Sequence, residues 1–158
     1  MSEYVVGVDE VGRGSLVGSA IVCAFRSQNS FFQALPFDVS DSKKINKKKR
    51  EEIYNYFKLN KGFNYNYQII VGKKKFIEKF NIHNVVLQCM KQSIILLSKK
   101  TDTVIIDGKF IPNGMEDYKV KALVKADDKI NQVSAASIIA KVYRDKLITK
   151  LHLKDNVY

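Results

Sequence analysis

The sequence has little that would hold a small secreted protein together or carry it through a membrane. Its 158 residues include no tryptophan, two prolines and two cysteines. Cys23 and Cys89 both lie in apolar stretches, where an isolated thiol usually packs as a small hydrophobe and does not form a disulfide. No apolar run approaches the roughly 20 residues of a transmembrane helix, and the first residues show no signal-peptide pattern. We therefore expect a cytoplasmic protein.

The length and composition fit one folded domain. Hydrophobic residues make up 46% of the chain and charged residues 27%, which is too apolar for a disordered protein. A chain of 158 residues can bury one substantial core, and it leaves no length for a second module. We expect a single domain over residues 1–158, and a monomer.

The charge is strongly one-sided. Lysine and arginine number 27 against 16 acidic residues, which gives a formal net charge of +11 and a pI near 9.6. An excess of this size suggests a polyanionic partner such as nucleic acid. Drift toward lysine and asparagine codons in an AT-rich genome would produce the same excess without a function. The charge alone leaves both explanations open.

Hydrophobic periodicity predicts an α/β domain that ends in a long amphipathic helix. The order is two strands, a helix, a third strand, two helices, two more strands and a closing helix. Between the second strand and the first helix, the polar stretch 26–45 is expected to be a surface loop. The expected strands are 5–8, 16–25, 65–71, 103–106 and 120–124, and the expected helices are 46–59, 73–80, 81–98 and 132–151.

Acidic residues stand at or just beyond the ends of three expected strands. They are Asp9-Glu10, Asp107 and Asp127-Asp128. In an α/β sheet such ends meet at one edge, and gathered carboxylates repel one another unless a cation neutralises them. Oxygen ligands select a hard ion such as Mg²⁺ or Mn²⁺, and two such ions can catalyse phosphodiester cleavage. Each acid alone would more often cap a turn, but the set favours a metal site.

Two polar segments could contact a phosphate backbone. The turn Gly12-Arg13-Gly14 permits close backbone approach because two of its residues lack Cβ. The segment 41–44 places two cations beside a hydroxyl, which suits phosphate contacts, although a lysine-rich loop is more often only solvated. The candidate residues are Gly12, Arg13, Gly14, Ser42, Lys43 and Lys44.

The closing helix adds a weaker candidate surface. Ser134, Ser137 and Lys141 fall at helical spacing and could present two hydroxyls and an ammonium group to a nucleic-acid backbone. Packing of small residues explains the serines equally well. His83 and His152 have no partner at metal-ligand spacing, and we assign them no role.

Four segments in chain order resemble the motifs of bacterial ribonuclease HII. Residues 7–14 (GVDEVGRG) resemble its opening motif, 41–44 (DSKK) the second block, and 103–108 (TVIIDG) the third. Residues 124–127 (VKAD) and 134–145 (SAASIIAKVYRD) resemble the fourth and longest. The resemblance covers nearly the whole chain.

This resemblance implies the ribonuclease H fold, a mixed five-stranded sheet flanked by helices, and cleavage of the RNA strand of RNA–DNA hybrids. It further implies two-metal-ion hydrolysis that leaves 5′-phosphate ends, and action on ribonucleotides embedded in duplex DNA. The 2′-hydroxyl, which distinguishes RNA from DNA, would be read by the backbone of Gly12, Arg13 and Gly14. The implied metal ligands and catalytic residues are Asp9, Glu10, Asp107 and Asp127.

The sequence departs from the family pattern at two places. Ser15 stands where the family often has proline. The family's later Gly-Tyr-x-Thr-like motif, whose tyrosine packs near the junction ribose, is not present, and Tyr158 is not given that role.

Two alternative assignments compete with ribonuclease HII. Ribonuclease HIII shares the acids and the Asp-Ser-Lys block but has a different turn after Asp-Glu. A non-catalytic hybrid- or DNA-binding module would explain the charge, but it needs no cluster of carboxylates.

Overall fold

A mixed β-sheet forms the centre of the molecule. The computed structural model describes residues 3–13, 18–40, 42–62 and 64–155. Within these, the sheet has five strands in the order β3-β2-β1-β4-β5; β1, β2 and β3 are antiparallel neighbours, whereas β4 and β5 run parallel to β1. This confirms the expected sheet. The strands are β1 (Tyr4–Val11), β2 (Ala20–Gln28), β3 (Tyr65–Gly72), β4 (Thr103–Asp107) and β5 (Lys119–Leu123).

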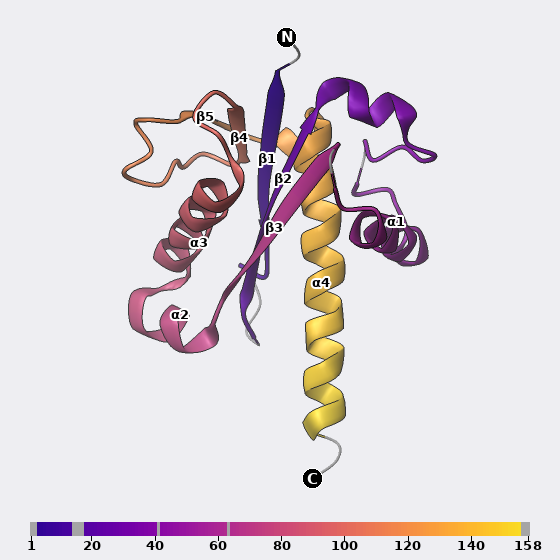
Figure 1. Ribbon diagram of the computed structural model, residues 1–158. Coiled ribbons are helices and arrows are strands. Elements are labelled where there is room, and N and C mark those ends of the chain that lie inside the picture. The colour runs from indigo at the N-terminus through magenta and orange to yellow at the C-terminus, as the bar shows by residue number, and fades with distance from the viewer. Residues whose placement is uncertain (1–2, 14–17, 41, 63, 156–158) are drawn as a thin grey trace.

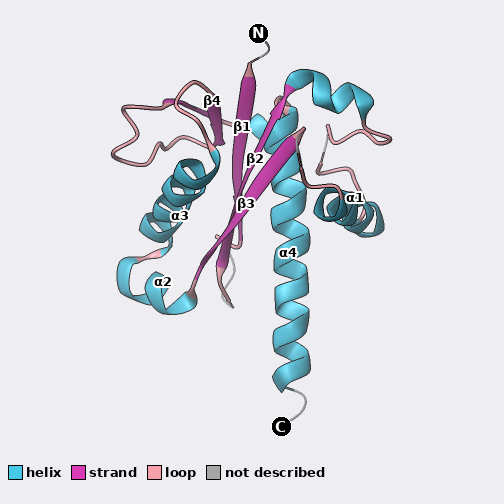
Figure 2. Ribbon diagram, viewed as in Figure 1, coloured by secondary structure: helices cyan, strands magenta, loops and turns pink. Residues whose placement is uncertain are grey.

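Helices cover both faces of the sheet. α2 and α3 lie on one side of it, and α1 and α4 lie on the other (Figure 1). α4 begins against the sheet and continues beyond it as one helix (Figure 2). Among the described residues, none of the helices is both long and apolar enough to cross a bilayer. The bounds are α1 (Lys47–Leu59), α2 (Lys74–Phe80), α3 (Ile82–Leu97) and α4 (Asn131–Asp155).

The two faces of β1 enter two different cores because strand side chains alternate between faces. Val6 and Val8 are fully buried in the core under α3. Gly7 faces α4, and a Cβ at this position would lie 2.2 Å from the backbone nitrogen of Val133. Only glycine leaves room for α4 to approach β1 this closely. The first turns of α4 are thereby fixed beside the end of β1.

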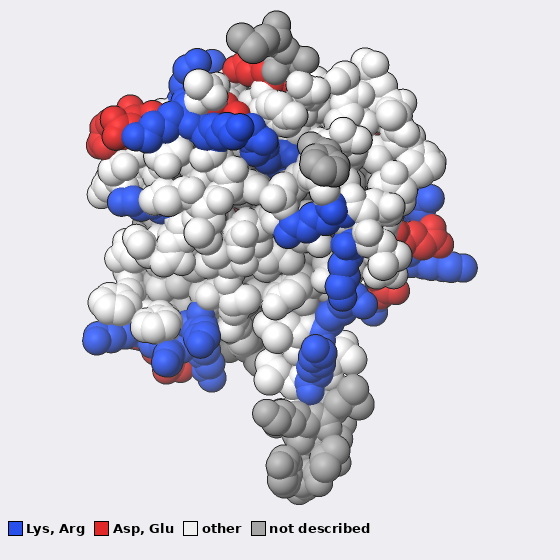
Figure 3. Space-filling view, in the orientation of Figure 1, with Lys and Arg blue, Asp and Glu red and all other residues white. Residues whose placement is uncertain are grey.

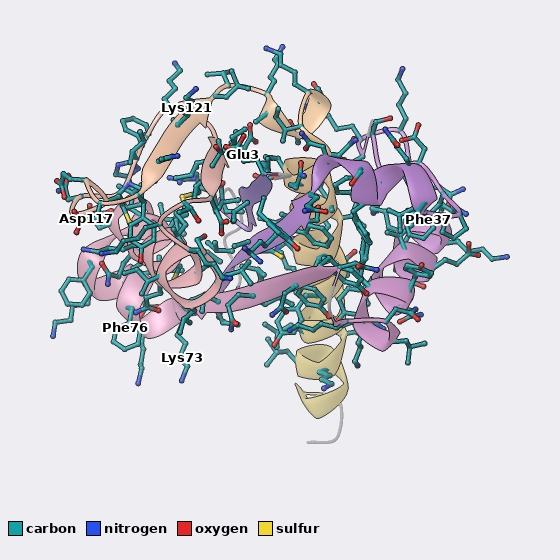
Figure 4. The ribbon with its side chains drawn as sticks, turned by 45° about the horizontal axis from the view of Figure 1, so that its top comes forward. Glu3, Phe37, Lys73, Phe76, Asp117 and Lys121 are labelled. Atoms are coloured by element: carbon teal, nitrogen blue, oxygen red, sulfur yellow. The ribbon has the colours of Figure 1, made fainter. Side chains whose placement is uncertain are left out.

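The stretch 26–45 is not the simple surface loop that its polarity suggested. β2 continues to Gln28, and a 3-10 helix follows at Asn29–Ala34. Phe31 packs with its ring centroid 6.2 Å from that of the buried Phe25. Phe37 lies on the same side of the molecule as α1, against which it packs (Figure 4). Aromatic burial therefore holds this segment on the core, although its polar residues conceal the pattern.

Candidate metal and nucleic-acid site

Two of the expected carboxylates lie at the ends of neighbouring parallel strands. Val8 of β1 is in register with Ile106 of β4, so the next residues, Asp9 and Asp107, lie side by side. Both follow apolar residues that the sheet buries, and the sheet therefore fixes their backbone positions. Asp9 itself is 6% exposed. Two acids are thus held together at the carboxyl end of the β1–β4 pair.

Asp127 reaches the same place from a tight turn. Lys125 adopts a left-handed conformation with φ of 57°, and residues 126–128 form a short 3-10 helix. The backbone N–H of Ala126 donates to Oδ1 of Asp107 at 2.9 Å, which ties this turn to the end of β4. As a result, one carboxylate oxygen from each of Asp9, Asp107 and Asp127 lies within 4.8 Å of the others.

The neighbouring Asp128 takes a different position. Its side chain is 39% exposed, whereas that of Asp127 is 6% exposed. On an extended strand, two neighbouring acids would point to opposite faces of the sheet. They diverge in a 3-10 turn instead, which the left-handed Lys125 initiates. A left-handed lysine has no clear signal in the sequence, so the geometry of this turn was not foreseen.

The electrostatics of the three carboxylates are unfavourable without a cation. Burial, and then the charges of Asp107 and Glu10, raise the pKa of Asp9 well above its usual range. Burial, with the nearby charge of Asp127, also raises the pKa of Asp107. Oδ1 of Asp127 is buried and has no hydrogen-bond partner among the residues that the structure describes. Buried like charges and an unsatisfied oxygen fit a hard divalent cation, which would supply the missing positive charge.

Glu10 lies at the same strand end but on the other face of the sheet, because adjacent strand residues alternate. It is not part of the three-carboxylate group. Its Oε1 accepts a hydrogen bond from Nε of Arg13 at 3.0 Å. Glu10, Arg13 and Asp107 line a common hollow of about 240 Å³, so Glu10 borders the site from the α3 side.

Lys43, an expected phosphate-binding residue, lies beside the carboxylate cluster. Its Nζ lies 3.7 Å from Oδ2 of Asp127 and 3.7 Å from Oδ2 of Asp128. These two charges raise the pKa of the lysine. Ser42 is buried and Lys44 is exposed. Gly14, a further candidate for substrate contact, and Asp41 lie outside the described residues.

The two candidate serines of α4 lie inside the protein. The Ser134 hydroxyl is buried and donates to the backbone carbonyl of Val39, so it connects α4 to the loop before α1. The Ser137 hydroxyl is also buried and hydrogen-bonds the carboxylate of Asp9. Lys141, one turn farther along, is partly exposed. Ser137 therefore contacts the carboxylate cluster directly, a role that its helical spacing alone could not reveal.

Two further residues shape the site without having been singled out from the sequence. Gly7 allows α4, with Ser137, to lie against β1. Arg144, on α4, lies close to Gly12, and its Nε would lie 3.3 Å from a Cβ added at that glycine. Gly12 has φ of +100°, so this position favours glycine on conformational grounds as well. The glycine spacing in residues 7–14 was the available signal for both close approaches.

Basic side chains are spread over several parts of the surface. On the face shown in Figure 3, they gather over α2, along α4 beside α1, and near β4 and β5. The net charge of +11 is therefore not concentrated in one stripe on this face. The carboxylate cluster locates the candidate site more sharply than the charge does.

Solved structures place this architecture in a known class. The chain superposes on the ribonuclease H2 from Pyrococcus horikoshii OT3 with a TM-score of 0.79 and 28% identity, over 96% of this chain and 76% of that one. It also superposes on Bst-RNase HIII in complex with Mn²⁺ with a TM-score of 0.71, over 90% of this chain and 52% of the other. At 22% identity the second match shows the fold alone. The protein has the ribonuclease H-like fold.

Sequence comparison gives the family within this class. Residues 6–158 match the family model described as Ribonuclease HII. Ribonuclease HII of Pelagibacter ubique is 44% identical over 156 residues, which are 99% of this chain and 80% of the relative. The chain therefore belongs to the ribonuclease HII family. This family assignment identifies it as a ribonuclease H, a nuclease that acts on RNA–DNA hybrids, and it favours HII over the HIII alternative.

Proposed function

We propose that this chain hydrolyses the RNA strand of hybrids, and single ribonucleotides embedded in duplex DNA, by two-metal-ion catalysis that leaves 5′-phosphate ends. The observation that carries the proposal is the convergence of Asp9, Asp107 and Asp127, with ligand oxygens within 4.8 Å of one another. A non-catalytic binding module would have no use for this cluster, because buried like charges weaken the fold unless a cation compensates them.

The proposed metal ligands are Asp9, Glu10, Asp107 and Asp127, and the proposed ions are Mg²⁺ or Mn²⁺. The first, third and fourth of these residues already form one group, and Glu10 borders it at the same strand end. Bound divalent ions would supply Lewis-acid stabilisation of the phosphoryl oxygens and lower the pKa of attacking water. The Mn²⁺ of the HIII structure belongs to that protein, and its presence there motivates testing both ions.

Hydrogen bonds from neighbouring residues fix the orientation of the carboxylates. Ser137 orients Asp9 through a hydrogen bond, and the backbone N–H of Ala126 holds one oxygen of Asp107. The unsatisfied Oδ1 of Asp127 is left as an acceptor for a cation. Such supporting contacts matter because catalytic groups must be held within fractions of an ångström of their working positions.

Substrate contacts are proposed for the turn after β1 and for lysines near the cluster. The backbone of Gly12, Arg13 and Gly14 would read the ribose 2′-hydroxyl, since a turn rich in glycine allows close approach. Lys43 is positioned to bind a phosphate once a metal ion takes over the charge of Asp127. Lys44 and Lys141 complete the proposed contacts with substrate. The other proposed residues, Ser42, Ser134 and Ser137, are buried and would support these contacts from within the protein. We also propose that the chain forms a single domain, is monomeric and lies in the cytoplasm.

The decisive experiment compares two adjacent aspartates. The substrates are a long RNA–DNA hybrid and duplex DNA with one embedded ribonucleotide, with Mg²⁺ or Mn²⁺ and with chelator. Asp127→Asn should lower the cleavage rate by orders of magnitude with little change in hybrid affinity, because the amide keeps the shape but loses the charge. Asp128→Asn, the matched control, should cleave like the wild type. Cleavage in excess chelator, or the reverse order of the two variants, would contradict the proposal.

A further inference from the structure

The guanidinium group of Arg13 is held from two sides. Its Nε donates to Oε1 of Glu10 at 3.0 Å, and its Nη1 lies 3.3 Å from Nδ1 of His83. Arginine carries five N–H donors and no acceptor, so Nδ1 of His83 must be the acceptor in this contact. This contact requires the tautomer of His83 that leaves Nδ1 free to accept and carries the N–H on Nε2. His83 lies 70 residues away in the sequence, which explains why no motif contains it.

His83 is itself firmly placed. It occupies the first turn of α3, which Asn81 caps by accepting a hydrogen bond from the backbone N–H of Asn84 at 3.0 Å. The ring of Phe110, in the loop after β4, meets the imidazole edge-to-face with centroids 4.7 Å apart. Val86, farther along the same helix, is fully buried in the core between α3 and the sheet. His83 thus connects the turn after β1 to a rigid helix.

We propose that His83 is a positioning residue that holds the Arg13 guanidinium beside the carboxylate cluster, where its other N–H groups bind a backbone phosphate of the substrate. This inference rests on the proposed function, because it assigns a step in substrate binding at the same site. Arginine suits this task, since its planar fork of donors matches the phosphate group. Arg13 is 37% exposed, so a substrate can reach it.

The two residues that contact the Arg13 guanidinium, Glu10 and His83, differ in charge. Glu10 is negatively charged and competes with a phosphate for the positive charge of Arg13. It is also a proposed metal ligand, so its contact with Arg13 depends on the state of the metal site. An accepting imidazole nitrogen carries no negative charge, so His83 orients the guanidinium without neutralising it. It therefore keeps Arg13 in place independently of the carboxylates.

A double-mutant cycle tests this role. The four proteins are the wild type, His83→Ala, Arg13→Ala and the double variant, assayed on duplex DNA with one embedded ribonucleotide. A net hydrogen bond is worth about 0.5–1.5 kcal/mol, so we expect His83→Ala to raise KM about two- to tenfold. We expect kcat to stay within about twofold, because the contact serves binding in the ground and transition states alike. In the Arg13→Ala background, removal of His83 should have no further effect.

Three further variants separate positioning from general destabilisation. His83→Gln keeps an acceptor and should restore most of the affinity, whereas His83→Leu should not. Gln92→Ala, an exposed residue on the same helix, should bind and cleave like the wild type. Equal effects of His83→Ala with and without Arg13, or an unchanged KM in His83→Ala, would overturn the inference.

A binding measurement keeps the test independent of catalysis. Affinity for the same duplex is measured by fluorescence anisotropy with chelator present, so that cleavage is not needed. His83→Ala should weaken binding by the same two- to tenfold factor. If the wild type does not cleave with metal, the proposed function fails, while an Arg13-dependent loss of affinity in His83→Ala would still support the positioning role. If the wild type cleaves but His83→Ala binds normally, only the positioning role fails.

Discussion

The two ends of the β1–β4 strand pair bury acids in opposite ways. At the amino end, Asp102 precedes β4 and is 3% exposed. It accepts hydrogen bonds from Nε and Nη2 of Arg26 at 2.7 and 3.1 Å, and from the backbone N–H of Lys99 at 2.8 Å. The guanidinium also lies 3.9 Å from the centre of the Tyr4 ring. The charge of Asp102 is therefore compensated by the protein itself.

At the carboxyl end, three acids are gathered with less compensation. Asp9 is almost as buried as Asp102, yet its closest charged neighbours include two other acids, Asp107 and Glu10. The exposed Lys43 contacts this cluster, with its Nζ 3.7 Å from Oδ2 of Asp127. A buried acid with a bidentate arginine stabilises a fold, whereas buried acids that repel one another require an external cation. Incomplete compensation, more than burial, distinguishes the site from the scaffold.

The largest expected difference between the two ends of the β1–β4 pair is the effect of a substitution on the cleavage rate. Asp9→Asn should reduce metal-dependent cleavage by orders of magnitude, because it removes a central ligand of the proposed ions. In chelator the same variant should be more stable than the wild type, because the amide relieves burial of a charge beside Asp107 and Glu10. Cleavage rate and thermal midpoint are measured on the same preparations. A variant that is both active and less stable would contradict this view of the cluster.

The stability difference should depend on pH in a defined direction. The pKa of Asp9 is raised in the folded state, so between about 4 and that raised value the folded protein binds more protons than the unfolded chain. In this window the free energy of unfolding of the wild type falls as pH rises, while Asn has no proton to lose. The advantage of Asp9→Asn in chelator should therefore grow with pH across the window. Thermal midpoints from pH 4 to 8 check the sign.

The next effect is on stability at the amino end. Asp102→Asn leaves Arg26 without its carboxylate partner, although the Arg26 side chain is only 17% exposed. Breaking a buried pair costs about 3 kcal/mol, or roughly 6–12 °C in the thermal midpoint for a chain of this size. The cleavage rate per folded molecule should not change. A large loss of kcat with an unchanged midpoint would show that this pair belongs to the site.

The smallest expected effect concerns close packing in the turn after β1. Gly12 and Gly18 have nearly equal positive φ values of +100° and +101°. An added Cβ would lie 3.0 Å from the carbonyl oxygen of Ser19 at Gly12, and would have nothing described within 4 Å at Gly18. Both alanine variants should lose about 1–2 kcal/mol from backbone strain. Gly12→Ala alone should also weaken cleavage at an embedded ribonucleotide, and equal cleavage by both variants would remove the turn from substrate recognition.

Much of this site was accessible from the sequence because strand ends carry a strong pattern. The apolar runs that end at Asp9 and Asp107 predicted both their proximity and their place at one sheet edge, and the structure shows the two acids side by side. The start of the first helix at Asn46 was also predicted, and the side chain of this residue caps α1 by accepting from the backbone N–H of Lys49 at 2.9 Å. Local periodicity and capping are short-range signals, so a single sequence carries them.

Other features depend on long-range contacts that leave no local pattern. The Arg13–His83 contact joins residues far apart in the chain, and the left-handed Lys125 that presents Asp127 breaks the usual preference for glycine. The 3-10 helix after β2 was missed because its aromatic residues are interspersed with polar ones. The contact of Ser137 with Asp9 was not predicted from its helical spacing. These positions are set by tertiary packing, which overrides local preference.

Metal-dependent stability tests the central claim most directly. Mg²⁺ and Mn²⁺ are titrated in turn into metal-free wild type, Asp9→Asn and Asp102→Asn, and the thermal midpoint is recorded. An ion at about 100 times its Kd stabilises the folded state by about 2.7 kcal/mol, which is roughly 5–11 °C here. We predict this shift in the wild type and in Asp102→Asn, and its loss in Asp9→Asn. Equal shifts in all three proteins, or no shift in the wild type, would contradict a metal site at the carboxyl end of β1 and β4.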